Sequence, residues 1–231
     1  MELPFPGPKF HDGCWMSNAQ NRLEPRWPAL LALLAVAGLR LALPGYLVIG
    51  PDWLLLVVVS ALIVPTVTSR QRGYHRLNQV LGYLLTSIVT ADMVWSLCLL
   101  LAALPSRKET PRALLVSAGA LWVTNILVFA LWYWRLDAGG PRARELRGVH
   151  TTGAFLFPQL TVSPAVRQNL GQQAWSPGFI DYLFLAFNTS TAFSPTDSPV
   201  LSRWAKALMM LQALISFATV ALLAARAVNI L

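Results

Sequence analysis

Residues 187–197, FNTSTAFSPTD, place a cluster of polar side chains between two strongly apolar stretches. Hydroxyl, amide and carboxylate oxygens can accept hydrogen bonds from a polar solute or replace part of the hydration shell of a cation. The members of this hydroxyl cluster that could take part are Asn188, Thr189, Ser190, Thr191 and Asp197. The pattern is typical of the lining of a conduit, of a binding site, or of a polar turn between helices.

A second set of polar residues follows one stripe of the apolar block 207–231. Gln212, Ser216 and Thr219 are spaced by four and three residues, and Arg226 comes seven residues later. Helical periodicity places all four on one face, which we expect to meet protein or water rather than lipid. Interhelical hydrogen bonding is the simpler interpretation of this stripe, and a wetted pathway is the alternative.

Ionisable and polar groups inside other apolar blocks are the third feature that could carry chemistry. Asp92 lies in the middle of the block 80–104, where inserting a carboxylate into a membrane costs about 2.5–3.5 kcal/mol. It therefore needs a partner, a proton or water, and two arginines towards block ends, Arg40 and Arg226, are the candidates for its counter-ion. Asn125, near the middle of another block, could join the same polar network.

The elements that must position these residues are long apolar blocks. The chain is 55% hydrophobic and 12% charged, whereas soluble domains carry about 25% charged residues. Most blocks approach the ~20 residues that a helix needs to cross a bilayer, so the sequence predicts an all-α, polytopic transmembrane bundle of five to six helices. The expected spans, after a polar tail at 1–27, are 28–49, 53–68, 80–104, 113–134 and 207–231. The third span carries polar groups on both faces and is expected at the centre of the bundle.

The segment 179–193 is the short element among these blocks. As a helix it would rise about 22 Å, less than the ~30 Å hydrocarbon core. It is either a short sixth span or a re-entrant half-helix, which Pro195 and Pro199 would end. The preceding loop, 135–178, has no domain of its own, and its apolar piece 154–162 is expected to lie on the membrane surface.

The charge distribution predicts an orientation. The formal net charge is +8, and nearly all of it flanks apolar blocks, so we interpret it as a topology signal rather than as a nucleic-acid-binding surface. Arginine-rich loops at 69–79 and 135–178 then place the N-terminus in the cytoplasm, although the basic loop 105–112 departs from the pattern. Arginine outnumbers lysine 15 to 3, which fits a GC-rich bacterial genome and hence a bacterial inner membrane. Tryptophan and tyrosine residues at block ends, Tyr133 among them, are expected to anchor the chain at the membrane interfaces.

The run 181–231 resembles the C-terminal part of a bacterial family of uncharacterised integral membrane proteins. It has the patterns D-Y-L, F-x-x-x-x-x-F and S-R-x-x-K-x-L-x-x-L before its last helix and ends in A-V-N-x-L. This resemblance implies a membrane fold and no particular activity. More weakly, the run resembles the pore helix, filter and inner helix of tetrameric cation channels, with the hydroxyls of 189–191 at the filter threonines. Those filters carry paired glycines where this chain has FSP at 193–195, so the resemblance does not extend to potassium selectivity.

Two functions remain after enzymes are considered. The chain has no nucleotide-binding loop, HExxH, nucleophile elbow or paired-carboxylate pattern, so we expect neither catalysis nor a cofactor or metal. One function is a channel- or transporter-like conduit, with the hydroxyl cluster at one mouth and the polar stripe along the inner helix. The other is a non-conducting structural or accessory protein whose polar groups join helices or bind a partner. The lipid bilayer is the expected surrounding in both, and assembly as a homo-oligomer is compatible with either.

Overall fold

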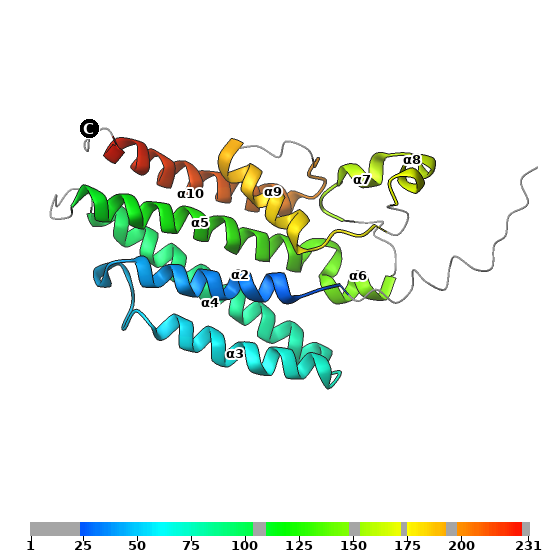
Figure 1. Ribbon diagram of the computed structural model, residues 1–231, viewed down its shortest axis with the longest axis horizontal. Helices are drawn as coiled ribbons and strands as arrows, with labels where there is room; N and C mark the ends of the chain where they lie inside the picture. Colours follow the sequence, from blue (N-terminus) through cyan, green and yellow to red (C-terminus); the bar gives the residue numbers. More distant parts are fainter. Residues whose placement is uncertain (1–23, 104–109, 148–152, 172–174, 193–197, 228–231) are drawn as a thin grey trace, which may run out of the picture.

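The computed structural model describes residues 24–103, 110–147, 153–171, 175–192 and 198–227, which form a helical bundle (Figure 1). Strand pairing in this part of the chain is limited to one isolated bridge between Phe155 and Val200. The longest helices are α3 (Leu54–Gln71), α4 (His75–Ala103), α5 (Pro111–Leu136) and α10 (Arg203–Ala227). The others are α2 (Trp27–Leu39), α6 (Pro141–Arg147), α7 (Pro158–Thr161), α8 (Pro164–Asn169) and α9 (Phe179–Ala192), with 3-10 turns at Arg40–Ala42, Gly45–Leu47 and Asp137–Gly139.

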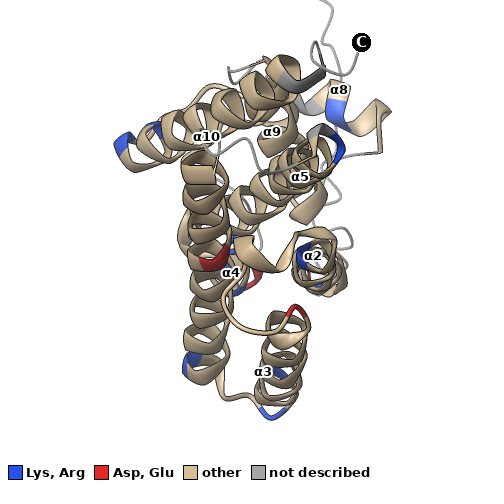
Figure 2. Cartoon of the chain, turned by 90° about the vertical axis from the view of Figure 1, so that its left-hand side faces the viewer, with Lys and Arg blue, Asp and Glu red and all other residues tan. Residues whose placement is uncertain are grey.

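The central helix of the bundle is α5. It contacts α2 and α4 on one side and α9 and α10 on the other. Figure 2 shows α3 at the far edge of the α2–α4 side. In the most apolar stretch that contains α5, 67% of the residues are buried, against 39% in α4. The span expected at the centre, 80–104, corresponds to α4, so that prediction was wrong. The polar residues of this helix do not require that position, because Thr86 and Thr90 bond to carbonyls within α4 as well as to α5.

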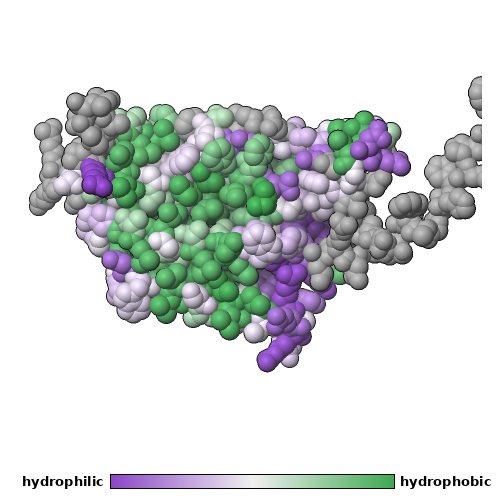
Figure 3. Space-filling model, viewed as in Figure 1, coloured by the Kyte–Doolittle hydropathy of each residue, from purple (hydrophilic) through white to green (hydrophobic). Residues whose placement is uncertain are grey.

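Four described helices, α3, α4, α5 and α10, are long and apolar enough to cross a membrane. Their outward faces carry large exposed apolar side chains, including Val64 on α3, Trp95 on α4 and Phe217 on α10. Figure 3 shows apolar residues spread across the middle of one face, with hydrophilic residues gathered at the end where α6 lies. An apolar outer surface of this extent marks contact with lipid or with other protein.

The expected first span, 28–49, is not one helix. The α-helix ends at Leu39, and after one 3-10 turn the backbone becomes extended at Leu43 (φ −86°, ψ 139°). Pro44 is the cause, because a proline disfavours the helical conformation in the residue before it. The 13 residues of α2 rise about 20 Å, so the chain covers the remaining distance to α3 as turns and extended segments.

The helices α9 and α10 begin at the same end of the bundle, which we call the α6 end. The segment just before α10 pairs with the segment 154–156, through Leu156 N–H to Pro199 O (2.9 Å) and Leu201 N–H to Ala154 O (2.8 Å). The first residues of α9 pack against the end of α5 at the same level, with the rings of Phe179 and Trp134 6.0 Å apart. Figure 1 shows α9 ending beside the middle of α10, which continues towards the opposite end. In the structure, α9 thus runs from the α6 end to a point beside the middle of α10, and the described chain resumes at the α6 end just before α10.

The apolar piece expected on the membrane surface, 154–162, is partly buried in the bundle. Phe155 is 1% exposed, and its ring lies 5.2 Å from that of Tyr133 and 6.2 Å from that of Tyr182. Phe157 is also buried, whereas Leu156 is half-buried and the residues from Pro158 to Val162 are half-buried or exposed. Two aromatic rings inserted between α5 and α9 bury more apolar area there than a surface position would, which explains the difference.

A sharp reversal after α5 holds this arrangement together. The buried carboxylate of Asp137 accepts hydrogen bonds from the Tyr182 hydroxyl at 2.6 Å and from the Ala154 backbone N–H, and so ties α9 and the 154–156 segment to the end of α5. The reversal requires glycine at position 140, where φ is +89° and a Cβ would lie 2.7 Å from the carbonyl oxygen of Arg135.

Candidate functional site

The side chain of Gln212 is the centre of a buried polar cluster between α5, α9 and α10, which we call the Gln212 cluster. Its Nε2 donates to the carbonyl oxygen of Ala186 at 2.7 Å and to Oγ of Ser190 at 2.8 Å, and its Oε1 accepts from the Tyr133 hydroxyl. Gln212, Ser190 and Tyr133 are each 0% exposed. Because an amide has two donor hydrogens, protein groups use the whole donor capacity of Gln212.

Ser216 extends the Gln212 cluster by one turn of α10. Its hydroxyl donates to the carbonyl oxygen of Ser190 at 2.6 Å and accepts from Nε1 of Trp122 at 3.0 Å. Thr219, one turn further, is equally buried but bonds only to carbonyls of its own helix. The polar stripe of α10 therefore faces protein over these three residues, and its interhelical bonds come from Gln212 and Ser216.

Asn125 brings an unpaired acceptor into the same cluster. Its Nδ2 donates to the backbone oxygen of Gln212 at 3.3 Å, so α5 and α10 are joined here too. Its Oδ1 is buried and has no hydrogen-bond partner among the described residues. Leaving such an oxygen unpaired costs about 1–3 kcal/mol, so this position is suited to a water molecule or a further donor.

The hydroxyl cluster of residues 187–197 divides between two environments. Thr189 and Ser190 point into the bundle and are buried, and the Thr189 hydroxyl donates to the carbonyl oxygen of Leu185 at 2.8 Å. Asn188 is half-buried and Thr191 is exposed, both on the last turns of α9. The inward pair thus belongs to the packing of α9 on α5 and α10. The outward pair lies on the opposite side of α9, where the Thr191 hydroxyl donates to the carbonyl oxygens of Phe187 and Asn188 and its oxygen can still accept a hydrogen bond.

The last residues of the hydroxyl cluster, 193–197, lie outside the described residues, and Asp197 is among them. What the structure adds to this region is the position of the α9 terminus. The final turn of α9 lies beside Ser216, close to the midpoint of the 25-residue helix α10.

Arg40 is the counter-ion of Asp92. Its guanidinium forms an ion pair with the Asp92 carboxylate and donates to the carbonyl oxygen of Ile49, and the two side chains are 4% and 13% exposed. The pair holds the connection between α2 and α3 against the middle of α4. The side chain of Arg226, the other candidate, lies outside the described residues. No hydrogen bond or ion pair in the described ranges joins this pair to the Gln212 cluster, so the residues singled out in the sequence form two separate groups.

The sequence analysis did not identify two members of the Gln212 cluster, Trp122 and Tyr133. Tyr133 is expected at the membrane interface because it lies at a block end, but its ring is fully buried and its hydroxyl meets Gln212. The signal that could have identified both is their spacing. Trp122, Asn125 and Tyr133 lie three and eight residues apart, which places them on one stripe of α5, as Gln212 and Ser216 lie on one stripe of α10.

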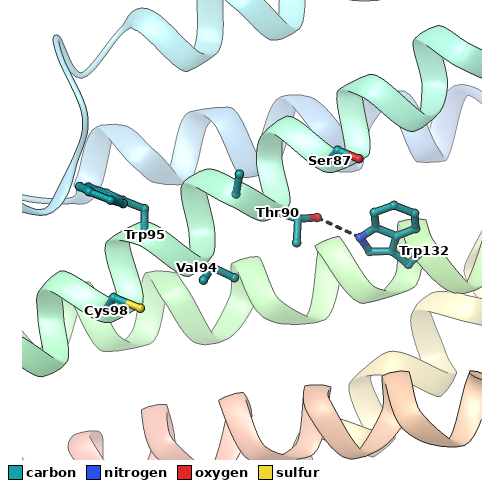
Figure 4. Close-up of a pocket in the computed structure, with 7 residues that line it drawn as sticks. Ser87, Thr90, Val94, Trp95, Cys98 and Trp132 are labelled. Carbon is teal, nitrogen blue, oxygen red and sulfur yellow. Dashed lines mark hydrogen bonds between the residues drawn. The ribbon is translucent and has the colours of Figure 1, made fainter.

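A groove of about 450 Å³ on the outer flank of α4 offers different chemistry (Figure 4). It is lined mainly by apolar groups and includes Val94, Trp95 and Cys98. Two hydroxyl residues, Ser87 and Thr90, also line it, and Thr90 accepts a hydrogen bond from Nε1 of Trp132 at 2.9 Å and donates to a carbonyl of its own helix. With no charged residue in its lining, the groove suits an apolar chain rather than an ion.

Comparisons with protein-family models, with curated proteins and with solved structures found no match to this chain. The candidate site is therefore defined by its own geometry, a half-helix that ends beside the middle of a long helix and is fastened to it by the Gln212 cluster.

Proposed function

We propose that the chain is a multi-pass protein of a bacterial inner membrane that conducts ions or small polar solutes, with α9 as a re-entrant half-helix. The observation that carries this proposal is the common starting end of α9 and α10, together with the α9 terminus beside the middle of α10. In a bilayer, the 14 residues of α9 rise about 21 Å and so end within the hydrocarbon core of about 30 Å. Non-helical backbone at that depth is tolerated only inside protein or beside water.

The water would lie on the outward side of α9. The inward side is closed by the hydrogen bonds of the Gln212 cluster, which use protein groups throughout except at Oδ1 of Asn125. The outward side of the last turns presents Asn188 and Thr191. The C-terminus of a helix carries about half a negative charge, and half-helix C-termini coordinate cations in transporters, so a cation is the favoured solute.

A conduit on the outward side of α9 needs a second wall. After the exposed charges of Arg203 and Lys206 at the start of α10, the exposed side chains of α9 and α10 are otherwise apolar, with Phe184, Phe187 and Phe217 each 46% exposed or more. A second copy of the chain would cover these faces and enclose the polar end of α9, so we assign the conduit to a homo-oligomer.

Charge supports one orientation of this unit. The turn region 69–76 and α6 together carry six arginines, namely Arg70, Arg72, Arg76, Arg142, Arg144 and Arg147, and both lie at the α6 end with the start of α2. The positive-inside rule then places the α6 end in the cytoplasm, so α9 enters from the cytoplasmic side. In the cation channels that the sequence weakly resembles, the pore helix enters from outside, so the half-helix here would be inverted.

The second candidate function is a non-conducting structural or accessory membrane protein. It is favoured by the internal hydrogen bonding of Gln212 and Ser216, which is what helix packing alone would require. In that case the outward residues of α9 would bind a partner.

Flux into liposomes distinguishes the two functions. The wild type should admit cations, and Asn188→Leu should lower that flux about tenfold or more, because an apolar side chain replaces a polar group beside the pathway. Thr191→Val should act in the same direction, whereas Thr161→Val, the same exchange at an exposed position of α7, should leave flux unchanged. Absence of flux over a panel of monovalent cations, divalent cations and uncharged polar solutes would favour the structural function.

A further inference from the structure

An arginine-rich cavity of about 420 Å³ lies at the α6 end, between the start of α2, the α3–α4 turn, the end of α5 and α6. It is distinct from the Gln212 cluster and from the outward face of α9. The charged residues that line it are Arg26, Arg70, Arg76, Arg135, Arg142 and Glu145. Five arginines against one glutamate leave an excess of four positive charges, with histidine counted as neutral.

The single carboxylate of the cavity is already shared. Glu145 lies 3.0 Å from Arg26, 3.3 Å from Arg70 and 3.7 Å from Arg142, so three guanidinium groups compete for one negative charge. Burial lowers the pKa of Arg26, and the attraction of Glu145 only partly opposes that effect. The nearby Glu24 does not relieve the excess, because its carboxylate forms an ion pair with Arg144, at 3.0 Å. The protein thus leaves much of the charge in this cavity uncompensated.

Arg135 is held in place in the cavity by contacts with neutral groups and has no acidic partner. No carboxylate of the described residues lies within ion-pair distance of it. Its Nε donates to Oγ1 of Thr86 at 2.9 Å, and its guanidinium carbon lies 5.4 Å from the centre of the Trp134 ring. Gly82 provides the space, since a Cβ there would overlap the guanidinium. These contacts orient the group against Gly82, and its two terminal nitrogens donate to no other group among the described residues.

A guanidinium fork of this kind matches the oxygens of a phosphate group, to which it can donate two parallel hydrogen bonds. The cavity also has an apolar side, formed by Leu30 and Leu33 of α2 and by Tyr83 of α4. Phosphate beside an apolar chain is the chemistry of a phospholipid, and basic pockets between membrane helices bind anionic headgroups. We propose that this cavity binds a phosphate group and that an anionic phospholipid supplies it. The proposal goes beyond the conduit and needs only that the helices lie in a bilayer.

The test measures lipid retention and thermal stability of the full chain in detergent. Phosphatidylglycerol should raise the melting temperature and remain bound in native mass spectra, whereas phosphatidylcholine should do neither. Arg135→Gln should lower the affinity for phosphatidylglycerol about fivefold or more, because one arginine near an anionic lipid contributes about that factor in affinity. Arg72→Gln is the matched control, since Arg72 is exposed in the same α3–α4 turn but does not line the cavity.

Several outcomes would overturn the proposal. Equal responses to the two lipids, or equal loss in the Arg72 and Arg135 variants, would show a diffuse charge effect and no site. If Arg135→Gln does not fold, Arg142→Gln takes its place, because the Arg142 side chain is 43% exposed and its removal disturbs little packing. Inorganic phosphate is a separate arm, and stabilisation by it at millimolar concentration with no further effect of phosphatidylglycerol would overturn the lipid as the source. Loss of flux in liposomes would leave all of these readouts unchanged, so the two proposals fail separately.

Discussion

Replacement of Gln212 by leucine tests whether the polar stripe of α10 fastens α9 and α5 as the structure describes. The leucine keeps nearly the same volume but removes three side-chain hydrogen bonds, to Ala186, Ser190 and Tyr133. Hydrogen bonds between membrane helices average about 0.6 kcal/mol each, so the three predict a loss of about 2 kcal/mol in the free energy of unfolding. The loss should exceed this value if the Tyr133 hydroxyl finds no new partner, because an unpaired buried hydroxyl itself costs about 1–3 kcal/mol.

The assay is reversible unfolding in mixed micelles at rising SDS fraction, followed by tryptophan fluorescence. Met210→Leu is the matched control, since Met210 lies on the same helix and is 62% exposed, and its stability should stay within about 0.5 kcal/mol of the wild type. Adding Tyr133→Phe to Gln212→Leu should cost less than the sum of the two single changes, because the double variant leaves neither partner unpaired. Equal stability of Gln212→Leu and Met210→Leu would refute the placement of this stripe against α5 and α9.

Three further tests of the fold use the same assay. Arg40→Met and Asp92→Leu should each cost about 3–5 kcal/mol because the partner charge stays buried, and the double variant should recover most of that loss; two fully additive single effects would contradict the ion pair. Phe155→Ala should lower the free energy of unfolding by about 3–5 kcal/mol because its ring is buried among other aromatic rings, whereas Leu156→Ala should lower it by less than about 1 kcal/mol. Similar losses in the two variants would contradict the burial of Phe155 and favour a surface position for this segment. Gly140→Ala should cost about 1–3 kcal/mol, since φ there is +89° and the new Cβ would meet a backbone oxygen at 2.7 Å; an unchanged midpoint would mean a different reversal after α5.

The helical bundle and the inward face of α10 could be predicted because each depends on local periodicity and composition. Gln212, Ser216 and Thr219 recur at helical spacing, and a polar stripe in an apolar helix has to face protein or water. The need of Asp92 for a counter-ion follows similar reasoning, since a carboxylate at membrane depth needs a partner, but the sequence left Arg40 and Arg226 as equal candidates and the structure shows Arg40. The prediction of one continuous span over 28–49 was wrong, although Pro44, which lies inside it, could have indicated the break.

The features that could not be predicted depend on contacts between distant parts of the chain. The placement of α9 beside the first half of α10 is set by the pairing of 154–156 with 199–201 and by the buried carboxylate of Asp137, which joins Ala154 to Tyr182. None of these pairs has a local sequence signature. The central position of α5 likewise follows from packing against four other helices, and polar residues on both faces of α4 suggest a different centre.

The arrangement of α9 and α10 is tested most directly by the side from which single cysteines react with a membrane-impermeant maleimide. In a background without the two native cysteines, the exposed positions to label are Gln71→Cys, Ser176→Cys, Leu201→Cys and Arg112→Cys. If α9 is re-entrant, positions 71, 176 and 201 react from one side of the membrane, the cytoplasmic side, and position 112 reacts from the other. Reaction of position 201 from the same side as position 112 would mean that α9 crosses the membrane, and it would contradict both the half-helix and the conduit built on it.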